Sequence, residues 1–239
     1  MNQYSRLKKK YGHLPFTSYL HDEYSENGED GVLMEIFTRL ELIKSEDPKL
    51  CVEFGAWDGK LGSNTFQFVK NHDYAAIYIE SNRKKFKSLK ETQKEYPSII
   101  ALNKKIKFKK NSKNSLDRIL YEYGASKSFH LLSIDIDSYD LAVWESLTNF
   151  TPIIVVIEIN SSIPPGILSR HTKKHRGNSF SSTVTVGTQK NYTLVCHTGN
   201  LIFVHNSKME LLNIDKKFQE HSESLFLYDS TWTYSSKVK

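Results

Sequence analysis

Three aspartates follow one apolar run closely enough to act on the same ligand. The run 129–134 is followed by Asp135, Asp137 and Asp140. A buried, unpaired carboxylate costs so much free energy that such acids need hydrogen-bond donors or a cation. Asp140 has an ordinary explanation as the cap of the next helix, because its side chain can accept a hydrogen bond from a free backbone N–H. Asp135 and Asp137 have no such explanation, and they are the candidate catalytic residues. Either carboxylate could remove a proton from a hydroxyl group, or a bound divalent ion could lower the pKa of that hydroxyl and orient it.

A second polar strand end could complete a cation site with these aspartates. The apolar run 153–159 contains Glu158 and is followed by Asn160, and a neighbouring parallel strand would place either side chain beside Asp135 or Asp137. Such hard oxygen ligands favour Mg²⁺, Mn²⁺ or Ca²⁺ over Zn²⁺. One prediction is therefore a site for Mg²⁺ or Mn²⁺ formed by Asp135, Glu158 and Asn160. The alternative is a metal-free polar network around a cofactor and a substrate.

The segment after the first expected strand contains a glycine turn. Glu53, Gly55 and Gly59 come in close succession, and glycines let a backbone turn sharply and approach a ligand. The spacing matches neither the G-x-G-x-x-G pattern nor a phosphate-binding loop with its lysine, so phosphate binding by this turn is poorly supported. An acidic strand end suits a cationic or hydroxyl-rich ligand instead. The alternative is a tight turn that Asp58 caps.

An acid also follows the second expected strand. The apolar run 75–79 is followed by Glu80 and Ser81. A carboxylate at this place can accept hydrogen bonds from both ribose hydroxyls of an adenosine-containing cofactor. The alternative is that Glu80 is an acid near a helix N-terminus, where the helix dipole favours it. A glycine turn followed by an acid one strand later is more specific for a cofactor site than either feature alone.

Bringing these side chains together requires a parallel sheet, because ligands bind beyond the carboxyl ends of its strands. Short apolar runs alternate with amphipathic ones, which is the pattern of a parallel sheet covered by helices on both faces. The expected strands are 50–54, 75–79, 98–102, 129–134 and 153–159, and the expected helices are 29–43, 64–71, 82–95, 115–123 and 140–149. The runs 191–196 and 200–205 are joined too closely for a parallel crossover, which predicts an antiparallel hairpin. The fold class is therefore α/β, a Rossmann-like seven-stranded methyltransferase fold whose mostly parallel sheet ends in a C-terminal antiparallel β-hairpin.

Length and composition describe one globular domain with short flanking segments. The 239 residues are 38% hydrophobic and 25% charged, which excludes a fibrous or mainly disordered chain. We expect a lead-in at 1–23, the methyltransferase domain at 24–206 and a C-terminal extension at 207–239. No apolar stretch is long enough for a membrane span, and no apolar signal segment follows the basic N-terminal residues. Cys51 and Cys196 are too few for a disulfide framework, so a cytoplasmic location is expected.

The net charge of +6 comes largely from two basic runs, at 104–113 and 170–176. Each run can be a solvated loop of a lysine-rich protein. The other interpretation is a landing site for an anionic partner such as a nucleotide-sugar, an acidic glycan or nucleic acid. His171 and His175 lie in the second run, either as substrate contacts or as exposed members of a basic loop. Charge alone does not decide between these interpretations.

Four segments, 24–31, 52–59, 132–140 and 156–164, resemble a family of S-adenosylmethionine-dependent methyltransferases. These are small bacterial and viral proteins related to the FkbM-type enzymes and often associated with polysaccharide biosynthesis. The likeness runs in matching order from Tyr24 to Val204, and Ser138 and Tyr139 stand where relatives usually have Gly-Asn. It implies that the glycine turn binds the methionine and sulfonium part, that Glu80 binds the ribose, and that the helix start at 63–65 receives the methionine carboxylate. The implied cofactor-binding residues are Glu53, Gly55, Ala56, Gly59, Asn64, Glu80 and Ser81.

The residues and the resemblance together predict an S-adenosylmethionine-dependent O-methyltransferase that methylates a sugar hydroxyl of a glycan or of its precursor. A nucleic-acid methyltransferase is one rival, suggested by the basic runs. It is not favoured, because we expect no separate target-recognition domain and find no Asn-Pro-Pro-Tyr-type motif. A non-catalytic binding module is a second rival, because fold does not fix function. Trp232 and Tyr234 could cover a pocket, pack on the domain or mediate oligomerisation.

Overall fold

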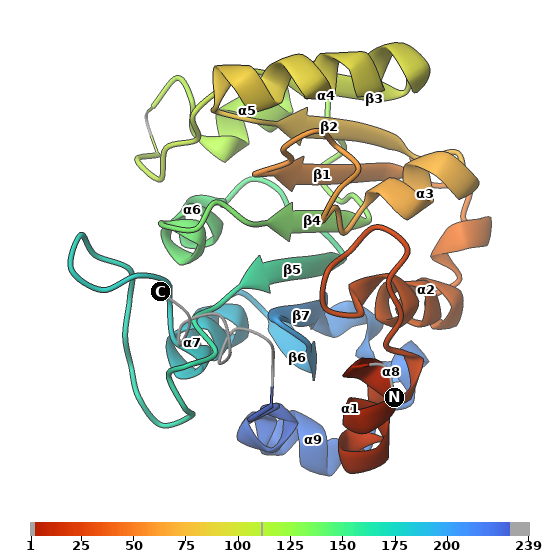
Figure 1. Cartoon of the computed structure of the whole chain (residues 1–239), viewed down its shortest axis with the longest axis vertical. Helices are drawn as coiled ribbons and strands as arrows, with labels where there is room; N and C mark the ends of the chain where they lie inside the picture. The colour runs from red at the N-terminus through yellow and green to blue at the C-terminus, as the bar shows by residue number, and fades with distance from the viewer. Residues whose placement is uncertain (1–2, 111, 230–239) are drawn as a thin grey trace.

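The sheet has seven strands and the expected topology. In the computed structural model, which describes residues 3–110 and 112–229, the strands lie in the order β3-β2-β1-β4-β5-β7-β6 (Figure 1). Strands β1 to β5 are parallel to their neighbours, whereas β7 is antiparallel to both β5 and β6. The predicted α/β, seven-stranded methyltransferase fold with a C-terminal antiparallel hairpin is confirmed.

The elements follow the expected alternation along the chain. The strands are β1 (Leu50–Phe54), β2 (Ala75–Ile79), β3 (Ile99–Leu102), β4 (Leu131–Ile134), β5 (Ile154–Glu158), β6 (Tyr192–His197) and β7 (Asn200–His205). The helices are α1 (Gln3–Tyr11), α2 (Glu29–Arg39), α3 (Phe66–Asn71), α4 (Arg83–Glu95), α5 (Leu116–Glu122), α6 (Asp140–Ser146), α7 (Phe180–Gln189), α8 (Met209–Leu212) and α9 (Lys216–Glu220). The carboxyl ends of β1, β2, β4 and β5 therefore share one edge of the sheet, at the left in Figure 1.

Alternating side chains of the strands form a separate core on each face of the sheet. Successive residues of a strand point to opposite faces, so Cys51 packs with α2 and α3 on one side while Val52 packs with α5, α6 and α7 on the other. Both side chains are fully buried. Burial on both faces explains why the parallel strands are nearly continuous apolar runs in the sequence. The rigid sheet can therefore hold the loops at its carboxyl edge in fixed positions.

Helices α2 and α7 show the clearest differences from the expectation. The helix expected at 29–43 ends at Arg39, because Glu41 has a left-handed backbone (φ 57°) that α-helical residues do not adopt, and a short 3₁₀ turn, Leu42–Lys44, follows. Helix α7 was not foreseen. Its sequence is rich in threonine and valine, whose branched side chains lower helix propensity. Burial of Phe180 and Val186 against the sheet stabilises it instead.

Both flanking segments pack on the central sheet. Leu7, Tyr11 and Leu20 from residues 1–23 belong to the same core as α2. On the C-terminal side, the Leu227 backbone N–H donates to Nδ1 of buried His197 at 2.8 Å. The division at 23/24 and 206/207 stays a prediction about the sequence. Trp232 and Tyr234 lie outside the described residues.

Within residues 3–110 and 112–229, no helix combines the length and the apolar character that crossing a membrane requires.

Candidate functional site

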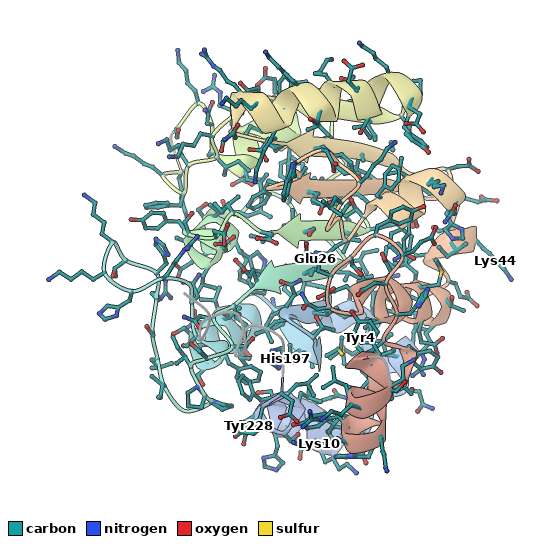
Figure 2. The ribbon with its side chains drawn as sticks, viewed as in Figure 1. Tyr4, Lys10, Glu26, Lys44, His197 and Tyr228 are labelled. Atoms are coloured by element: carbon teal, nitrogen blue, oxygen red, sulfur yellow. The ribbon has the colours of Figure 1, made fainter. Side chains whose placement is uncertain are left out.

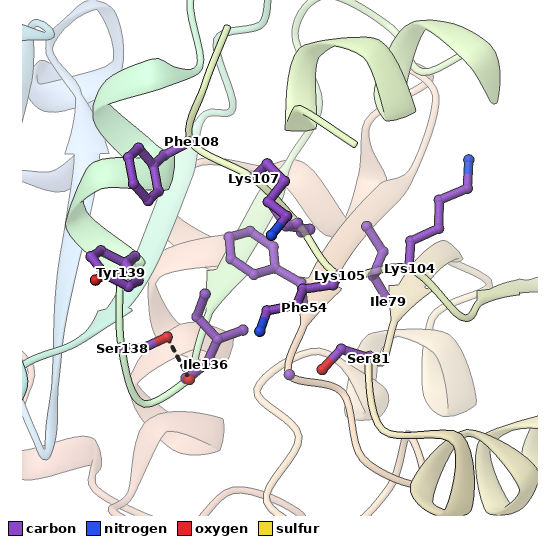
Figure 3. Close-up of a pocket in the computed structure, with 12 residues that line it drawn as sticks. Phe54, Ile79, Ser81, Lys104, Lys105, Lys107, Phe108, Ile136, Ser138 and Tyr139 are labelled. Carbon is purple, nitrogen blue, oxygen red and sulfur yellow. Dashed lines mark hydrogen bonds between the residues drawn. The ribbon is translucent and has the colours of Figure 1, made fainter. Parts of the chain in front are cut away.

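Two adjoining pockets open at the carboxyl edge of the sheet. The first, of about 390 Å³, is the acidic pocket, because it is lined by the carboxyl groups of Glu26, Glu80, Asp135, Asp137 and Glu158. The second, of about 360 Å³, is the lysine pocket, which is lined by Lys104, Lys105 and Lys107 together with apolar side chains (Figure 3). Gly55, Ser81 and Ile136 line both pockets. The two pockets therefore form one continuous depression with opposite charges at its two ends.

At Gly55, the backbone after β1 lies directly against the backbone after β4. The Gly55 backbone has φ +86°, and its N–H donates to the Ile79 carbonyl oxygen at 3.0 Å. A Cβ atom built at Gly55 would lie 1.5 Å from the carbonyl oxygen of Asp135. No other amino acid fits this position, so Gly55 directly sets the spacing between the glycine turn and Asp135.

Replacing Gly55 with alanine is expected to lower the free energy of unfolding by about 3 kcal/mol. The added Cβ atom would clash with the Asp135 backbone, and alanine is strained in the left-handed conformation that Gly55 adopts. Gly124→Ala is the matched control, since Gly124 also has a positive φ (+68°) but nothing lies within 4 Å of its Cβ position. The control should lose only about 1 kcal/mol. Urea unfolding of both variants measures the difference, and equal losses would contradict the tight contact at Gly55.

Glu80 lies at the wall of the acidic pocket and is held there by backbone groups. Its Oε2 atom accepts the Trp57 N–H at 3.1 Å, and Oε1 accepts the Asn82 N–H at 2.6 Å. Its carbonyl oxygen accepts Nδ2 of Asn103 at 2.7 Å. An ionised carboxylate has about four acceptor positions, so each oxygen keeps one position for a ligand hydroxyl. Ser81 lies beside it and lines both pockets.

Asp135 and Glu158 come from adjacent strands and face the same acidic pocket. Burial raises the pKa of Asp135 well above its usual value, and the negative charges of Glu158 and Asp140 raise that pKa further. Among the described residues, no group donates a hydrogen bond to the Asp135 carboxylate that would offset this cost. Asp135 is therefore a carboxyl group with an unusually high proton affinity that faces a pocket, which is the property expected of a general base.

Asp137 and Asp140 have different places in the loop after β4. The Asp140 carboxylate is buried and accepts the N–H groups of Ile136 and Ser138 at 2.7 and 2.8 Å. Burial raises the pKa of Asp140 to about 6. Asp137 has a left-handed backbone (φ 58°) and an exposed side chain that lies 3.6 Å from Arg176. Asp140 thus fixes the loop that presents Asp137 to the acidic pocket.

Glu53 and Asn64 lie behind the pockets and not in their lining. Glu53 is buried, and its Oε2 atom accepts the hydroxyl groups of Ser63 at 2.6 Å and Thr65 at 2.5 Å. Its Oε1 atom accepts the Asn64 N–H at 3.2 Å, while the Asn64 amide donates to Ser133. The N–H groups at the start of α3 are therefore used within the chain, since those of Thr65 and Phe66 both donate to Ser63. The expectation that this helix start receives a ligand carboxylate stays a prediction, and these hydrogen bonds give it no support.

Ala56 and Gly59 stabilise the turn between β1 and α3. The Gly59 N–H donates to the Ala56 carbonyl oxygen at 2.6 Å. A Cβ at Gly59 would lie 2.7 Å from Leu89 of α4, so this glycine permits close packing of α4. Of the seven predicted cofactor-binding residues, the structure brings Gly55, Glu80 and Ser81 to the pockets, whereas Glu53, Ala56, Gly59 and Asn64 shape the turn behind them.

The structure does not bring the three predicted metal ligands together. Asp135 and Glu158 line the acidic pocket, but Asn160 does not. The Asn160 side chain donates from Nδ2 to the Arg176 carbonyl oxygen and accepts the Ser162 N–H at Oδ1. Within the described part of the chain, no three histidine, cysteine, aspartate or glutamate side chains are grouped so that they could hold a metal ion. Asn160 therefore stabilises the loop after β5 through these hydrogen bonds and is not a metal ligand in this arrangement.

Residues that the sequence did not single out complete the acidic pocket. Trp57 is 43% exposed, and the Lys85 ammonium lies 4.2 Å from the centre of its ring. Glu26 projects toward β4 and β5 from the loop that precedes α2 (Figure 2). A signal for Glu26 was present, since it lies inside the segment 24–31 that carries part of the family resemblance.

The loop that bears Glu26 is fixed by two buried acids of α2. The Asp30 carboxylate accepts the consecutive N–H groups of Glu23, Tyr24 and Ser25 at 2.6 to 2.8 Å. The Glu29 carboxylate accepts the Thr198 hydroxyl at 2.5 Å and Nδ2 of Asn200 at 3.0 Å, both from the hairpin of β6 and β7. Glu29 and Asp30 thus have structural roles, and the loop between α1 and α2 brings Glu26 to the acidic pocket.

The histidines divide between the core and the loop after β5. His130 is buried and shares a hydrogen bond of 2.8 Å with the Tyr74 hydroxyl, so its role is structural. His171 lies edge-on to Tyr139, with ring centres 4.7 Å apart. His175 is exposed and belongs to the basic loop.

Comparisons with known proteins find structural likenesses at low sequence identity. No family model matches the sequence, and no curated protein matches it. One similar solved structure is TrmK of M. capricolum with S-adenosyl-homocysteine, at 14% identity over 71% of this chain and 68% of that chain (TM-score 0.41). Another is a putative caffeoyl-CoA O-methyltransferase from Staphylococcus aureus, at 15% identity over 85% and 91% (TM-score 0.43).

A third similar structure is the N-terminal domain of EvdMO1 in the presence of S-adenosyl-homocysteine and D-fucose. It is 7% identical and covers 86% of this chain and 97% of that chain (TM-score 0.46). At such low identities and TM-scores, these likenesses identify no activity or acceptor for this chain. The resemblance of the sequence to FkbM-type enzymes stays a prediction, because no family model matches.

Proposed function

We propose that this chain is an S-adenosylmethionine-dependent O-methyltransferase that methylates a sugar hydroxyl of a glycan or of its precursor. The observation that supports this proposal is the acidic pocket, in which five carboxyl groups and the Gly55 turn meet at the carboxyl edge of a methyltransferase-type sheet. An open pocket with this much negative charge suits a cationic ligand that also carries hydroxyl groups. A nucleoside with a sulfonium and an ammonium group has both properties.

The residues present fit such a cofactor. Glu80 has one unused acceptor position on each oxygen for the two ribose hydroxyls. Phe54, Ile79 and Ile106 offer an apolar surface for the adenine ring in the neighbouring pocket. Gly55 lets the backbone approach the ligand, and Asp135 and Glu158 place negative charge near the sulfonium. When bound, the cofactor supplies a methyl group on a positively charged sulfur that becomes a neutral thioether after transfer.

Asp135 is proposed as the general base for the acceptor hydroxyl. As the hydroxyl oxygen forms a bond to the methyl carbon and the carbon–sulfur bond breaks, the hydroxyl proton moves to the Asp135 carboxylate. The raised pKa of Asp135 favours this proton transfer, because a base works best when its pKa is near the working pH. Asp137, exposed on the same pocket, is proposed to orient the acceptor by accepting a hydrogen bond from a second hydroxyl.

The proposal contains no metal ion. Asp135 and Glu158 supply two of the oxygen ligands that Mg²⁺ or Mn²⁺ would need, but the Asn160 side chain is already used by the loop after β5. Treatment with EDTA followed by Mg²⁺ checks this point, and an activity that depends on the added ion would require a different third ligand.

Calorimetric titration of the whole chain with S-adenosylmethionine and with S-adenosyl-homocysteine tests the proposed function. We expect both molecules to bind at one site, because Glu80 and the apolar wall contact the adenosine that they share. Free lysine is the control ligand, since it brings positive charge and an amino-acid group to the acidic pocket without the adenosine. A folded protein that gives no heat with either sulfur compound would contradict the proposal.

A further inference from the structure

Two lysine ammonium groups point into the lysine pocket. Figure 3 shows the side chains of Lys105 and Lys107 extending across this pocket, whereas the Lys104 side chain points away from it. Lys104 instead pairs with Glu122 at 2.8 Å. Ile106 between them is buried, so Lys105 and Lys107 lie on the open side of the same segment. The two positive charges therefore converge on one space.

The segment that carries these lysines is fixed in place by Asn114. The Lys107 N–H donates to the Asn114 carbonyl oxygen at 2.9 Å, and Nδ2 of Asn114 donates to the Lys105 carbonyl oxygen at 3.1 Å. Among the described residues, no carboxylate forms an ion pair with Lys105 or Lys107. Two like charges that share a pocket repel each other unless an anion lies between them. The arrangement thus has the features of an anion site.

The proposed cofactor uses this pocket only for its adenine ring, which lies on the apolar wall, and it brings no anion to the two lysines. Its adenosine is uncharged. Its one anionic group, the methionine carboxylate, is attached to the same carbon as the ammonium group, which belongs in the acidic pocket next to Asp135 and Glu158. An anion at Lys105 and Lys107 must therefore come from a second molecule, and the continuous depression places that molecule beside the reacting centre.

A row of aromatic rings borders the same pocket. The Phe108 and Tyr139 rings have centres 5.0 Å apart, and His171 lies beside Tyr139. Phe108 is 46% exposed and Tyr139 is 37% exposed, so both can contact a ligand. Aromatic faces beside cationic groups stack on flat rings such as nucleobases and hold the anionic groups attached to them.

We propose that the acceptor carries a phosphate group, as a sugar phosphate or a nucleotide-linked sugar, and that Lys105 and Lys107 bind this phosphate. The sugar then extends toward Asp135 and Asp137, and a base, where one is present, stacks on Tyr139. The inference rests on the proposed function only in calling this molecule the acceptor. Phosphate binding at the two lysines is a separate property of the pocket.

The test measures binding by calorimetry to the whole chain with S-adenosyl-homocysteine present in excess. The probes are inorganic pyrophosphate, glucose 1-phosphate, UDP-glucose and uncharged glucose. We expect at least one phosphate compound to bind about tenfold or more tightly than glucose, because hydrogen bonds between charged groups are stronger than those between neutral groups. Lys105→Gln and Lys107→Gln should each weaken that binding about tenfold.

Lys87→Gln is the matched control, because Lys87 is exposed on α4 away from both pockets and loses the same charge. It should bind the phosphate probes like the unchanged protein, and all three variants should keep their affinity for S-adenosyl-homocysteine. Failure of every phosphate probe to exceed glucose overturns the inference. So does a loss of S-adenosyl-homocysteine affinity in the Lys105 and Lys107 variants, because the lysines would then hold the cofactor.

Two further outcomes distinguish phosphate binding from nucleic-acid binding and from the proposed methyltransferase function. Tight binding of single-stranded oligouridylate together with no binding of the small phosphate compounds would assign the lysines to nucleic acid and overturn the inference. Binding of the phosphate probes by a protein that binds neither sulfur compound would support the anion site while the proposed methyltransferase function fails.

Discussion

Asp135→Asn is expected to slow methyl transfer at least about 100-fold, because the variant lacks the carboxylate that takes up the proton of the acceptor hydroxyl. The affinity for S-adenosyl-homocysteine should change little, since asparagine keeps the shape of the side chain and Glu80 still holds the adenosine. Single-turnover rates with a methyl-accepting substrate, measured beside calorimetric affinities, separate the two effects. A variant that keeps its rate would remove Asp135 from the mechanism.

Asp73→Asn is the matched control for this substitution. Asp73 is exposed in the turn before β2, at the opposite edge of the sheet, and asparagine tolerates its left-handed backbone (φ 58°). The control removes one carboxylate from the surface without touching either pocket. Its methyl-transfer rate should equal that of the unchanged protein.

The raised pKa of Asp135 also fixes the direction of two pH effects. Because the base must be ionised, the transfer rate of the unchanged protein should fall as the pH falls through this raised pKa. Stability changes in the opposite direction. A carboxyl group whose pKa is higher in the folded state favours folding most when it is protonated, and this contribution is lost as the pH rises through the folded pKa. Asp135→Asn should therefore unfold at a higher temperature than the unchanged protein at pH 8, and this advantage should disappear at acidic pH.

Glu80→Ala is expected to weaken S-adenosyl-homocysteine binding about 100-fold or more. The substitution removes the charged acceptor for two ribose hydroxyls, and each hydrogen bond to a charged group contributes about 1.5 to 3 kcal/mol. It also leaves the N–H groups of Trp57 and Asn82 without their acceptor, so the turn after β1 loses support. Calorimetry at several protein concentrations measures the affinity.

Two variants distinguish ligand binding from this local loss of support. Glu80→Gln keeps one acceptor oxygen and the shape of the side chain, and it should bind with an affinity between those of the unchanged protein and Glu80→Ala. Glu91→Ala removes an exposed acid from α4 and should have no effect. Equal affinities for Glu80→Ala and Glu91→Ala would exclude Glu80 from the cofactor site.

The part of the site that depends on strand ends could be predicted from the sequence. Apolar runs identify the parallel strands, and parallel strands deliver the residues that follow them to one edge. Glu80, Asp135, Asp137 and Glu158 therefore lie in one pocket as predicted. The family resemblance places Glu53 at the cofactor, but its position in the strand indicates that the side chain points into the core. It shares a face with buried Cys51 two residues earlier, so its side chain points toward α3 and not over the strand end.

The parts that depend on loops could not be predicted in the same way. The direction of the Asn160 side chain is set by a hydrogen bond to the Arg176 carbonyl oxygen, sixteen residues later. No pattern in the local sequence predicts that contact. Glu26 reaches the acidic pocket only because Asp30 gathers three backbone N–H groups of its loop. Helix α7 was missed because its threonine and valine residues favour strands, and tertiary packing overrides that preference.

The Glu29 carboxylate gains its full set of hydrogen-bond donors only late in the synthesis of the chain. Glu29 is fully buried, and its side-chain donors Thr198 and Asn200 lie 169 and 171 residues further along the chain. While a nascent chain still lacks the β6–β7 hairpin, the Glu29 carboxylate keeps the local Asn27 N–H as a donor but lacks Thr198 and Asn200, so burying it would cost free energy. The loop that carries Glu26 then stays unanchored on one side until the ribosome has released the hairpin. Because this loop bears Glu26, the acidic pocket gains its complete wall only after the hairpin has been synthesised.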